Sequence, residues 1–142
     1  MTTEQNKAVV RHFFEAFGAN DQEALKEMLA PDVAAYTHIG SGPVNREALL
    51  QGIGMWNSTF NDTRFTIEEQ IAEGDRVATR TTMYAVHSGG DFQGLAPTGK
   101  EVAVSGITIN RIRDGRIVEH RVNSDFLGLM QQLGLVPPPA SA

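Results

Sequence analysis

The apolar residues in the first part of the chain recur at helical spacing. Residues 9–17 carry apolar side chains every three or four positions, which predicts an amphipathic helix that ends near Gly18. A shorter apolar stripe follows Asn20, and Asn20 with Glu23 forms the capping-box pattern found at the start of a helix. Because proline cannot continue a helix, this second helix should end before Pro31. The two helices are expected to form a hairpin.

The residues that follow predict a short strand and a third helix. Residues 33–39 are expected to form the strand, and the turn-rich residues 40–43 end it. Asn45 is a good N-cap, and the apolar residues after it have helical spacing through Trp56. Trp56 therefore lies near the end of a helix, where it either belongs to the core or covers a binding pocket.

The second half of the chain changes from helical spacing to alternation. Residues 64–73 and 77–87 alternate apolar and polar side chains around a glycine turn, which predicts two strands. Residues 101–112 and 116–123 predict another pair, joined by the Asp114-Gly115 sequence that strongly favours a hairpin. The sheet should therefore be largely antiparallel.

Helices first and strands afterward is the element order of an α+β fold. We expect a curved, largely antiparallel sheet that wraps around the N-terminal helices and forms a cone with an internal pocket. A short helix over residues 126–133 should close the domain. At 142 residues the chain is long enough for one core, so residues 1–136 are interpreted as a single domain and residues 137–142 as a proline-rich tail.

Composition and charge narrow the classes of partner. Hydrophobic residues make up 41% and charged residues 20% of the chain, which is typical of a folded globular protein. The formal net charge of -5 disfavours nucleic acid as a partner. The chain has no cysteine, and its four histidines occur singly without metal-ligand spacing, so we expect neither disulfides nor a metal site. No secretion signal or membrane-spanning stretch is recognisable, and we expect a cytoplasmic protein without a membrane partner.

Three segments resemble a known family. Residues 90–100, GDFQGLAPTGK, resemble the Gly-x-x-x-Gly-x-x-Pro-Thr-Gly-Lys/Arg segment of the SnoaL-like polyketide cyclases, within the nuclear transport factor 2-like superfamily. Residues 113–120 resemble the penultimate hairpin of that family, and residues 125–134 resemble its closing helix. Pro97 and Gly99 also suit a chain reversal between strands, because proline presets one turn dihedral and glycine accepts a positive φ. The resemblance covers essentially the whole chain and implies the fold described above.

The resemblance also implies an activity and a residue that carries it. The family's characterised cyclases close a ring in a polyketide ester by intramolecular aldol condensation, without a metal or an organic cofactor, and use an aspartate as acid/base. The motif match places this aspartate at Asp125. The residue alone has a second interpretation, since Asp125 stands where a strand ends and a helix begins, and aspartate is a preferred N-cap. The implied ligand is a small hydrophobic compound with a carbonyl group.

Two residues of the last strand are expected beside Asp125. If residues 116–123 alternate strictly, Arg121 and Asn123 share the face of Asp125, and His120 points the other way. Asn123 would donate a hydrogen bond to a carbonyl or enolate oxygen. Arg121, which stands where the family commonly has tryptophan, would either stabilise negative charge or weaken Asp125 as a base. A β-bulge near the end of this strand would reverse the assignment.

Two histidines are further candidates for the binding site. His87 ends the face of residues 77–87 that we expect to point inward, and members of the family often carry histidine here. It would bind substrate or relay a proton, or it would be a structural histidine with satisfied hydrogen bonds. His38 alternates with Tyr36 on the first strand and is also expected to reach the cavity.

Two classes of function remain open. The first is an enzyme, namely a cyclase of aldol type or a related cofactor-free isomerase, lyase or hydrolase, with Asp125 as general acid/base. The second is a non-catalytic module that binds a small molecule or serves association. In either case the outer sheet face should carry Tyr84, Val118 and Val122, and we expect a homodimer through this face.

Overall fold

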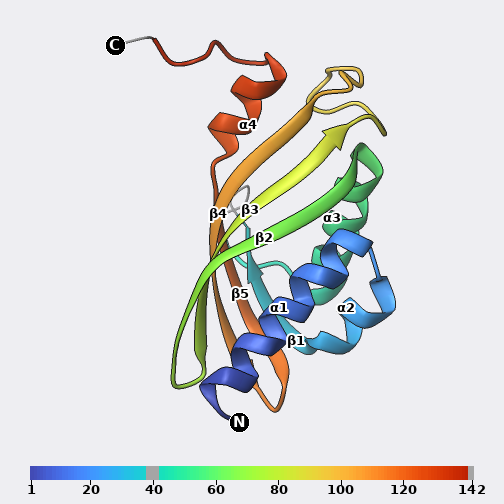
Figure 1. The fold of residues 1–142 in the computed structure, drawn as a ribbon. Helices are drawn as coiled ribbons and strands as arrows, with labels where there is room; N and C mark the ends of the chain where they lie inside the picture. The colour runs from blue at the N-terminus through green and yellow to red at the C-terminus, as the bar shows by residue number, and fades with distance from the viewer. Residues whose placement is uncertain (38–41, 141–142) are drawn as a thin grey trace.

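The computed structural model describes residues 1–37 and 42–140. Figure 1 shows a curved sheet with the N-terminal helices on one face and the C-terminal helix at one end. None of the helices in the described ranges is long and apolar enough to cross a membrane. In chain order the elements are α1 (Thr3–Ala19), α2 (Gln22–Met28), β1 (Leu29–Tyr36), α3 (Arg46–Thr59), β2 (Phe60–Glu73), β3 (Arg76–His87), β4 (Glu101–Arg113), β5 (Arg116–Ser124) and α4 (Phe126–Leu133).

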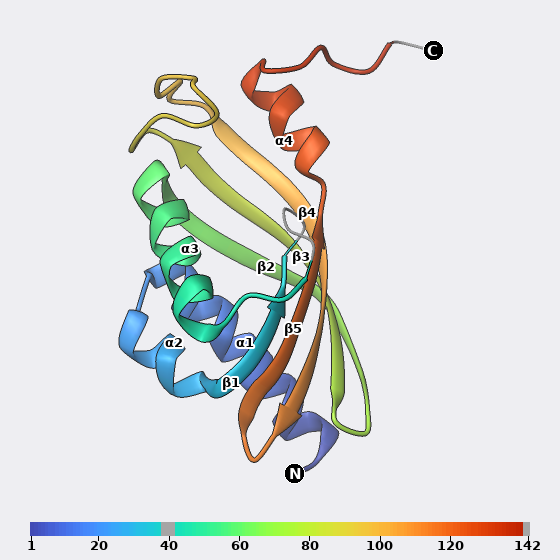
Figure 2. The ribbon, with the colours of Figure 1, turned by 180° about the vertical axis from the view of Figure 1, so that it is seen from behind.

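The strand order confirms the predicted α+β fold with a largely antiparallel sheet. The strands lie in the order β1-β5-β4-β3-β2, and all neighbours are antiparallel except β1 and β5, which are parallel. Figure 2 shows β1 beside β5, with α1, α2 and α3 against the same face of the sheet. The turn from β4 to β5 is formed by Asp114 and Gly115 with φ of 52° and 77°, the positive values that tight hairpin turns favour.

The start of α2 differs from the predicted one. Asp21 is its N-cap, and the Asp21 side chain accepts a backbone N–H three residues later at 3.1 Å. Asn20 instead ends α1 with a φ of 50°, a left-handed conformation that asparagine tolerates better than most residues. The predicted capping box of Asn20 with Glu23 is therefore wrong. The predicted end before Pro31 is confirmed, since α2 ends at Met28.

A β-bulge in β5 decides which residues face the helices. The register with β4 shifts between Ile117 and Glu119, so that Val118 is an extra residue in β5. Beyond this bulge His120 is buried and Arg121 is exposed. Strict alternation therefore does not hold in this strand, and the β-bulge that the sequence left open as the alternative reverses the faces of the strand residues beyond it.

The outer face of the sheet also differs from the predicted one. Val122 pairs with the buried Thr108 and therefore faces the helices, while Val118 is the bulge residue. Tyr84 keeps the predicted side, and the guanidinium of Arg64 lies 5.3 Å from its ring centre. The exposed large apolar residues on this face of the described sheet are Ile71, Ile107 and Ile109.

Two apolar clusters fill the inner face of the sheet. The first joins α1, α2, β1 and part of α3 to one half of the sheet, and the second lies near α4 at the other half. Burial of these side chains supplies the main driving force for the fold. Their fully buried members include Val10, Phe13, Leu25, Leu29 and Ile117 in the first cluster and Phe60, Ala85, Val102 and Leu129 in the second.

Helix α4 takes the place of a strand beside β4. The pairing of β5 with β4 stops at Gly106, so the remainder of β4 has no strand on that side. The Gln132 side chain fills this edge: its Oε1 accepts from the Ala103 N–H and its Nε2 donates to the Ala103 carbonyl, both at 2.8 Å. The N–H of Asp125 donates to the Ser105 carbonyl at 2.9 Å. The helix and the residue that precedes it are therefore both fixed to β4.

Candidate functional site

Asp125 lies between β5 and α4 and is the N-cap of the helix. Its Oδ1 accepts a hydrogen bond from the Gly128 N–H at 2.9 Å. Gly128 lets the carboxylate lie close to the helix backbone, because a Cβ atom at position 128 would force the Asp125 carboxylate to move. Among the described residues Oδ2 has no hydrogen-bond or ion-pair partner, and the side chain is exposed. One oxygen is thus bound and the other has no partner among the described residues, so the geometry is compatible with both the cap and the acid/base interpretations.

An aromatic cluster, formed by Trp56, Phe60, Phe92 and Phe126, covers the inner face of the sheet near α4. Trp56 stacks on Phe60 with ring centres 4.1 Å apart, and Phe92 lies 5.2 Å from Phe60. Phe126, the first residue of α4, lies 6.0 Å from Phe92. The Trp56 indole N–H donates to Thr63 Oγ1 at 3.2 Å, so its polar group is satisfied by the protein. The cluster offers apolar ring faces rather than polar contacts.

His87 is enclosed by the loop that connects β3 to β4. Its Nε2 lies 2.8 Å from the Gly90 carbonyl, and its Nδ1 lies 3.3 Å from the Thr98 N–H. The carbonyl only accepts and the amide only donates, so the ring carries its hydrogen on Nε2. Both ring nitrogens are therefore occupied by the protein, which favours the structural alternative for His87. The other predicted histidine, His38, lies outside the described residues.

Arg121 and Asn123 lie on the outer face of the sheet, away from the aromatic cluster. They pair with Ile109 and Ile107 of β4, which are 46% and 51% exposed. Both had been expected on an inner, pocket-lining face, and that expectation is wrong because the bulge at Val118 reverses the alternation.

The contacts of Arg121 are those of a surface residue. Its guanidinium lies 3.8 Å from the ring centre of Tyr36, in cation–π geometry. Its Nε donates to Glu119 Oε1 at 2.6 Å, and this hydrogen bond raises the pKa of Arg121. The arginine that replaces the family's tryptophan is thus engaged on the outer face.

A buried polar network, which the sequence did not indicate, crosses the inner face of β4 and β5. His120 Nδ1 lies 2.7 Å from Asn110 Oδ1, and Asn110 Nδ2 donates to Thr108 Oγ1 at 3.3 Å. We call these three residues the threonine–histidine network. Burial lowers the pKa of His120 to about 4, so the ring is neutral at pH 7. The pairing of Asn110 with His120 depends on the bulge, and strict alternation therefore hides it.

Burial of His120 predicts a loss of stability between pH 6.5 and pH 4. The ring has a pKa of 6.5 when unfolded and about 4 when folded, so the unfolded state takes up the proton first as the pH falls. The free energy of unfolding should therefore decrease by roughly 3 kcal/mol in total through this group. Urea unfolding of the wild type and of His120→Phe, from pH 7 to pH 4, measures the effect. The same pH dependence in both proteins would contradict it.

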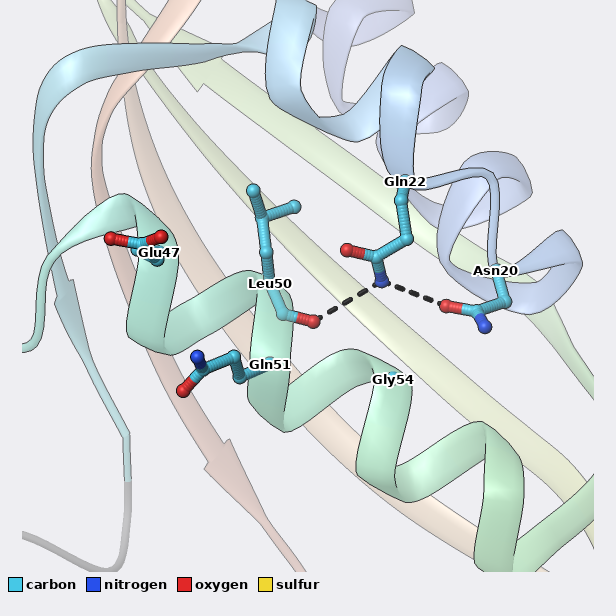
Figure 3. Close-up of a pocket in the computed structure, with 6 residues that line it drawn as sticks. All are labelled: Asn20, Gln22, Glu47, Leu50, Gln51 and Gly54. Carbon is cyan, nitrogen blue, oxygen red and sulfur yellow. Dashed lines mark hydrogen bonds between the residues drawn. The ribbon is translucent and has the colours of Figure 1, made fainter.

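Two open hollows lie on the helical side of the molecule. The first, of about 340 Å³, lies between α3 and the start of α2. Figure 3 shows the Gln22 amide nitrogen in this hollow, where it donates to Asn20 Oδ1 at 2.8 Å and to the Leu50 carbonyl at 3.1 Å. The second, of about 540 Å³, lies between α1 and β2. None of the predicted site residues within the described ranges lines either hollow.

The fold and the site together define an α+β protein with an acidic helix cap next to an aromatic cluster. It has an α+β fold in which a curved sheet packs against N-terminal helices, with a capping aspartate at the end of the last strand and an apolar aromatic cluster beside it. Across residues 1–37 and 42–140, no three histidine, aspartate or glutamate side chains are grouped to hold a metal ion. The groups that this site offers are an exposed carboxylate and apolar ring faces.

Comparison with known proteins narrows this class to a family. A family model described as SnoaL-like polyketide cyclase matches residues 7–133. The nogalonic acid methyl ester cyclase of Streptomyces nogalater is 32% identical over 124 residues, which are 84% of this chain and 90% of that protein. The chain belongs to the SnoaL-like polyketide cyclase family.

Solved structures have the same fold. The proposed polyketide cyclase IdmH from Streptomyces antibioticus superposes with a TM-score of 0.83 at 33% identity, covering 92% of this chain and 99% of that chain. The proposed hydroxylase AclR from Streptomyces galilaeus superposes with a TM-score of 0.88 at 26% identity, covering 99% and 87%. The fold is thus shared by proteins to which different activities are assigned, so activity must be argued from the site.

Proposed function

We propose that this protein closes a ring in a polyketide ester by aldol-type chemistry, with Asp125 as general acid/base and without a cofactor. Membership of the family supports the substrate class, and the relative from Streptomyces nogalater is named for a methyl ester. The observation that carries the role of Asp125 is its geometry. Gly128 holds one carboxylate oxygen, the other has no partner among the described residues, and Phe126 of the aromatic cluster follows directly.

The proposed reaction needs one group that takes a proton and returns it. Asp125 removes a proton from the carbon next to a carbonyl, and the enolate carbon attacks a second carbonyl carbon of the same molecule. One carbon–carbon bond forms, the π bond of the attacked carbonyl breaks, and the new alkoxide takes the proton back from Asp125. The proton removed from carbon ends on the new hydroxyl group and no atom is lost, so the cyclised product has the mass of the substrate.

The aromatic cluster suits a polyketide with conjugated rings. Trp56, Phe92 and Phe126 are half-buried, so part of each ring remains accessible. An aromatic contact contributes about 0.5–1.5 kcal/mol beyond the burial of its area, which favours flat unsaturated ligands over flexible aliphatic ones. The cluster would hold the substrate while Asp125 reacts with it.

Conversion of nogalonic acid methyl ester tests the proposal. The ester is incubated with the purified protein, and the products are separated by chromatography and identified by mass spectrometry. We expect a new compound of unchanged mass whose formation depends on the protein. Binding of this ester and of other polyketide methyl esters without conversion of any would contradict the cyclase proposal.

A second candidate function is that of a non-catalytic module that binds the same class of ligand. The exposure of the Asp125 side chain favours it, because an N-cap alone explains an aspartate at this position. In that case the wild type and Asp125→Asn would bind the ester with equal affinity, and neither would convert it.

We expect a homodimer formed through the outer face of the sheet. Ile107 and Ile109 of β4 are exposed on this face, and large apolar side chains exposed together mark association surfaces. Replacing Ile107 with aspartate should place a charge in the interface and produce a monomer, measured by size exclusion with light scattering. Met55→Asp is the matched control, because Met55 is an exposed apolar residue on α3, and this variant should stay dimeric. A monomeric wild type would refute the expectation.

A further inference from the structure

The hydrogen bonds of the threonine–histidine network all run in one direction, from His120 through Asn110 to Thr108. The Asn110 carbonyl oxygen only accepts hydrogen bonds, so the hydrogen of the 2.7 Å bond is on His120 Nδ1. The Asn110 amide nitrogen then donates to Thr108 Oγ1 at 3.3 Å. Thr108 accepts this bond and keeps its own hydrogen, for which the described residues provide no acceptor within hydrogen-bonding distance. Within residues 1–37 and 42–140 the network therefore ends in a hydroxyl group whose hydrogen has no acceptor.

This hydroxyl group lies on the strand pair that leads to Asp125. Thr108 of β4 pairs with Val122 of β5, and two residues further along the pair Gly106 is opposite Ser124, the residue before Asp125. Two residues of a strand span roughly 7 Å, the scale of one or two fused carbon rings. Gly106 has no side chain, and the Ser124 hydroxyl oxygen would lie 3.3 Å from a Cβ atom placed there.

A neighbouring buried threonine, Thr79, belongs to a second network, which is hydrogen-bonded to a helix. Thr79 of β3 pairs with Thr108, and its Oγ1 accepts from Gln70 Nε2 at 3.2 Å. The same Gln70 amide donates to the Lys7 carbonyl at 3.2 Å and accepts from Arg11 at 2.9 Å. This network ties the sheet to α1. Within the described residues the threonine–histidine network makes no hydrogen bond to a helix, and its contact with α1 is the Phe13 ring, 5.2 Å from the ring centre of His120.

We propose that Thr108 donates a hydrogen bond to the substrate oxygen that gains negative charge during ring closure, and that Asn110 and His120 are positioning residues for this donor. The proposal rests on the proposed function and adds a hydrogen-bond donor on the strand pair that ends next to Asp125. A donor fixed in advance in a buried place stabilises a developing oxyanion strongly, because it does not have to reorient during the reaction. The neutral His120 ring keeps the Asn110 amide turned so that its N–H meets Thr108.

Paired substitutions at position 108 test the donor. Thr108→Val removes the hydroxyl group at nearly constant volume, and Thr108→Ser keeps it. We expect kcat to fall at least about tenfold in Thr108→Val and to stay within about threefold in Thr108→Ser, with smaller changes in KM. Thr79→Val makes the same chemical change at a buried threonine outside the site and should leave kcat unchanged. A wild-type kcat in Thr108→Val would overturn the proposal.

A double-mutant cycle tests the positioning role of His120. His120→Phe removes the donor to Asn110 and should lower kcat in the wild-type background. In the Thr108→Val background it should cause no further loss, because His120 acts through the Thr108 hydroxyl group. Additive losses would overturn the positioning role. If Thr108→Val does not fold, Thr108→Ala takes its place in both experiments with the same expected outcomes.

Binding distinguishes failure of this inference from failure of the proposed function. Trp56 is the only tryptophan of the chain and belongs to the aromatic cluster, so its fluorescence reports binding of nogalonic acid methyl ester without turnover. If no variant converts the ester, the proposed function fails. Binding that is at least threefold weaker in Thr108→Val than in Thr108→Ser would still support the donor, and equal binding would overturn it. Equal conversion by all variants overturns only the role of Thr108.

Discussion

Replacing Asp125 with asparagine should lower the rate of ring closure by about 10²–10⁴-fold while the fold remains intact, because that is the usual contribution of a general base. Asparagine is as good an N-cap as aspartate, and its side-chain oxygen can accept the same bond from the Gly128 N–H. The substitution therefore removes only the ability to take up a proton. The measurements are kcat with the methyl ester and the midpoint of thermal unfolding.

Asp125→Ala is the matched control for the two roles of this residue. It removes the base and the helix cap together, so turnover should fall as in Asp125→Asn while the free energy of unfolding falls by a further ~1 kcal/mol. Unchanged turnover in Asp125→Asn would exclude Asp125 as the acid/base and leave the helix cap as its function. That outcome would favour the binding-module alternative.

Replacing His87 with leucine should destabilise the protein by about 3 kcal/mol. The substitution leaves the Gly90 carbonyl and the Thr98 N–H without their ring partner next to a side chain that is fully buried. Each unsatisfied buried group costs about 1–3 kcal/mol. For a chain of this size such a loss lowers the unfolding temperature by roughly 10 °C, which calorimetry resolves.

His12→Leu provides the control for this prediction. His12 is exposed on α1 and its nearest charged contact is Glu15 at 3.8 Å, so the substitution should change stability by no more than about 0.5 kcal/mol. A His87→Leu protein of normal stability that had lost binding of the methyl ester would contradict the structural role. His87 would then be a ligand-binding residue, the other alternative that the sequence left open.

The features that the sequence predicted correctly depend on local chemistry. Asn45 caps α3, because its side-chain oxygen accepts a hydrogen bond from the Ala48 N–H at 2.9 Å. Its position before an apolar stripe had indicated this role. The Asp114-Gly115 turn needs only residues that accept positive φ, and it forms where the sequence places it. Asp125 was located by a motif match, and its role as a cap followed from its place between a strand and a helix.

The features that the sequence did not predict depend on pairing between distant residues. The bulge at Val118 exists only in the register of β5 against β4, and strict alternation cannot show it. Arg121 and Asn123 were therefore assigned to the wrong face. The contact between Asn110 and His120, ten residues apart across a hairpin, is visible only once that register is known.

The side chain of Gln132 closes what would otherwise be an open strand edge. Where β5 has ended, the N–H and carbonyl of Ala103 would remain unpaired, and such groups are a template on which a strand of another molecule can add. Gln132 satisfies both groups in the manner of a peptide unit. Helix α4, which begins after the Asp125 cap, thereby protects the edge of β4 from pairing with a strand of another molecule. A substitution that destabilises this helix would therefore reduce solubility as well as the proposed activity.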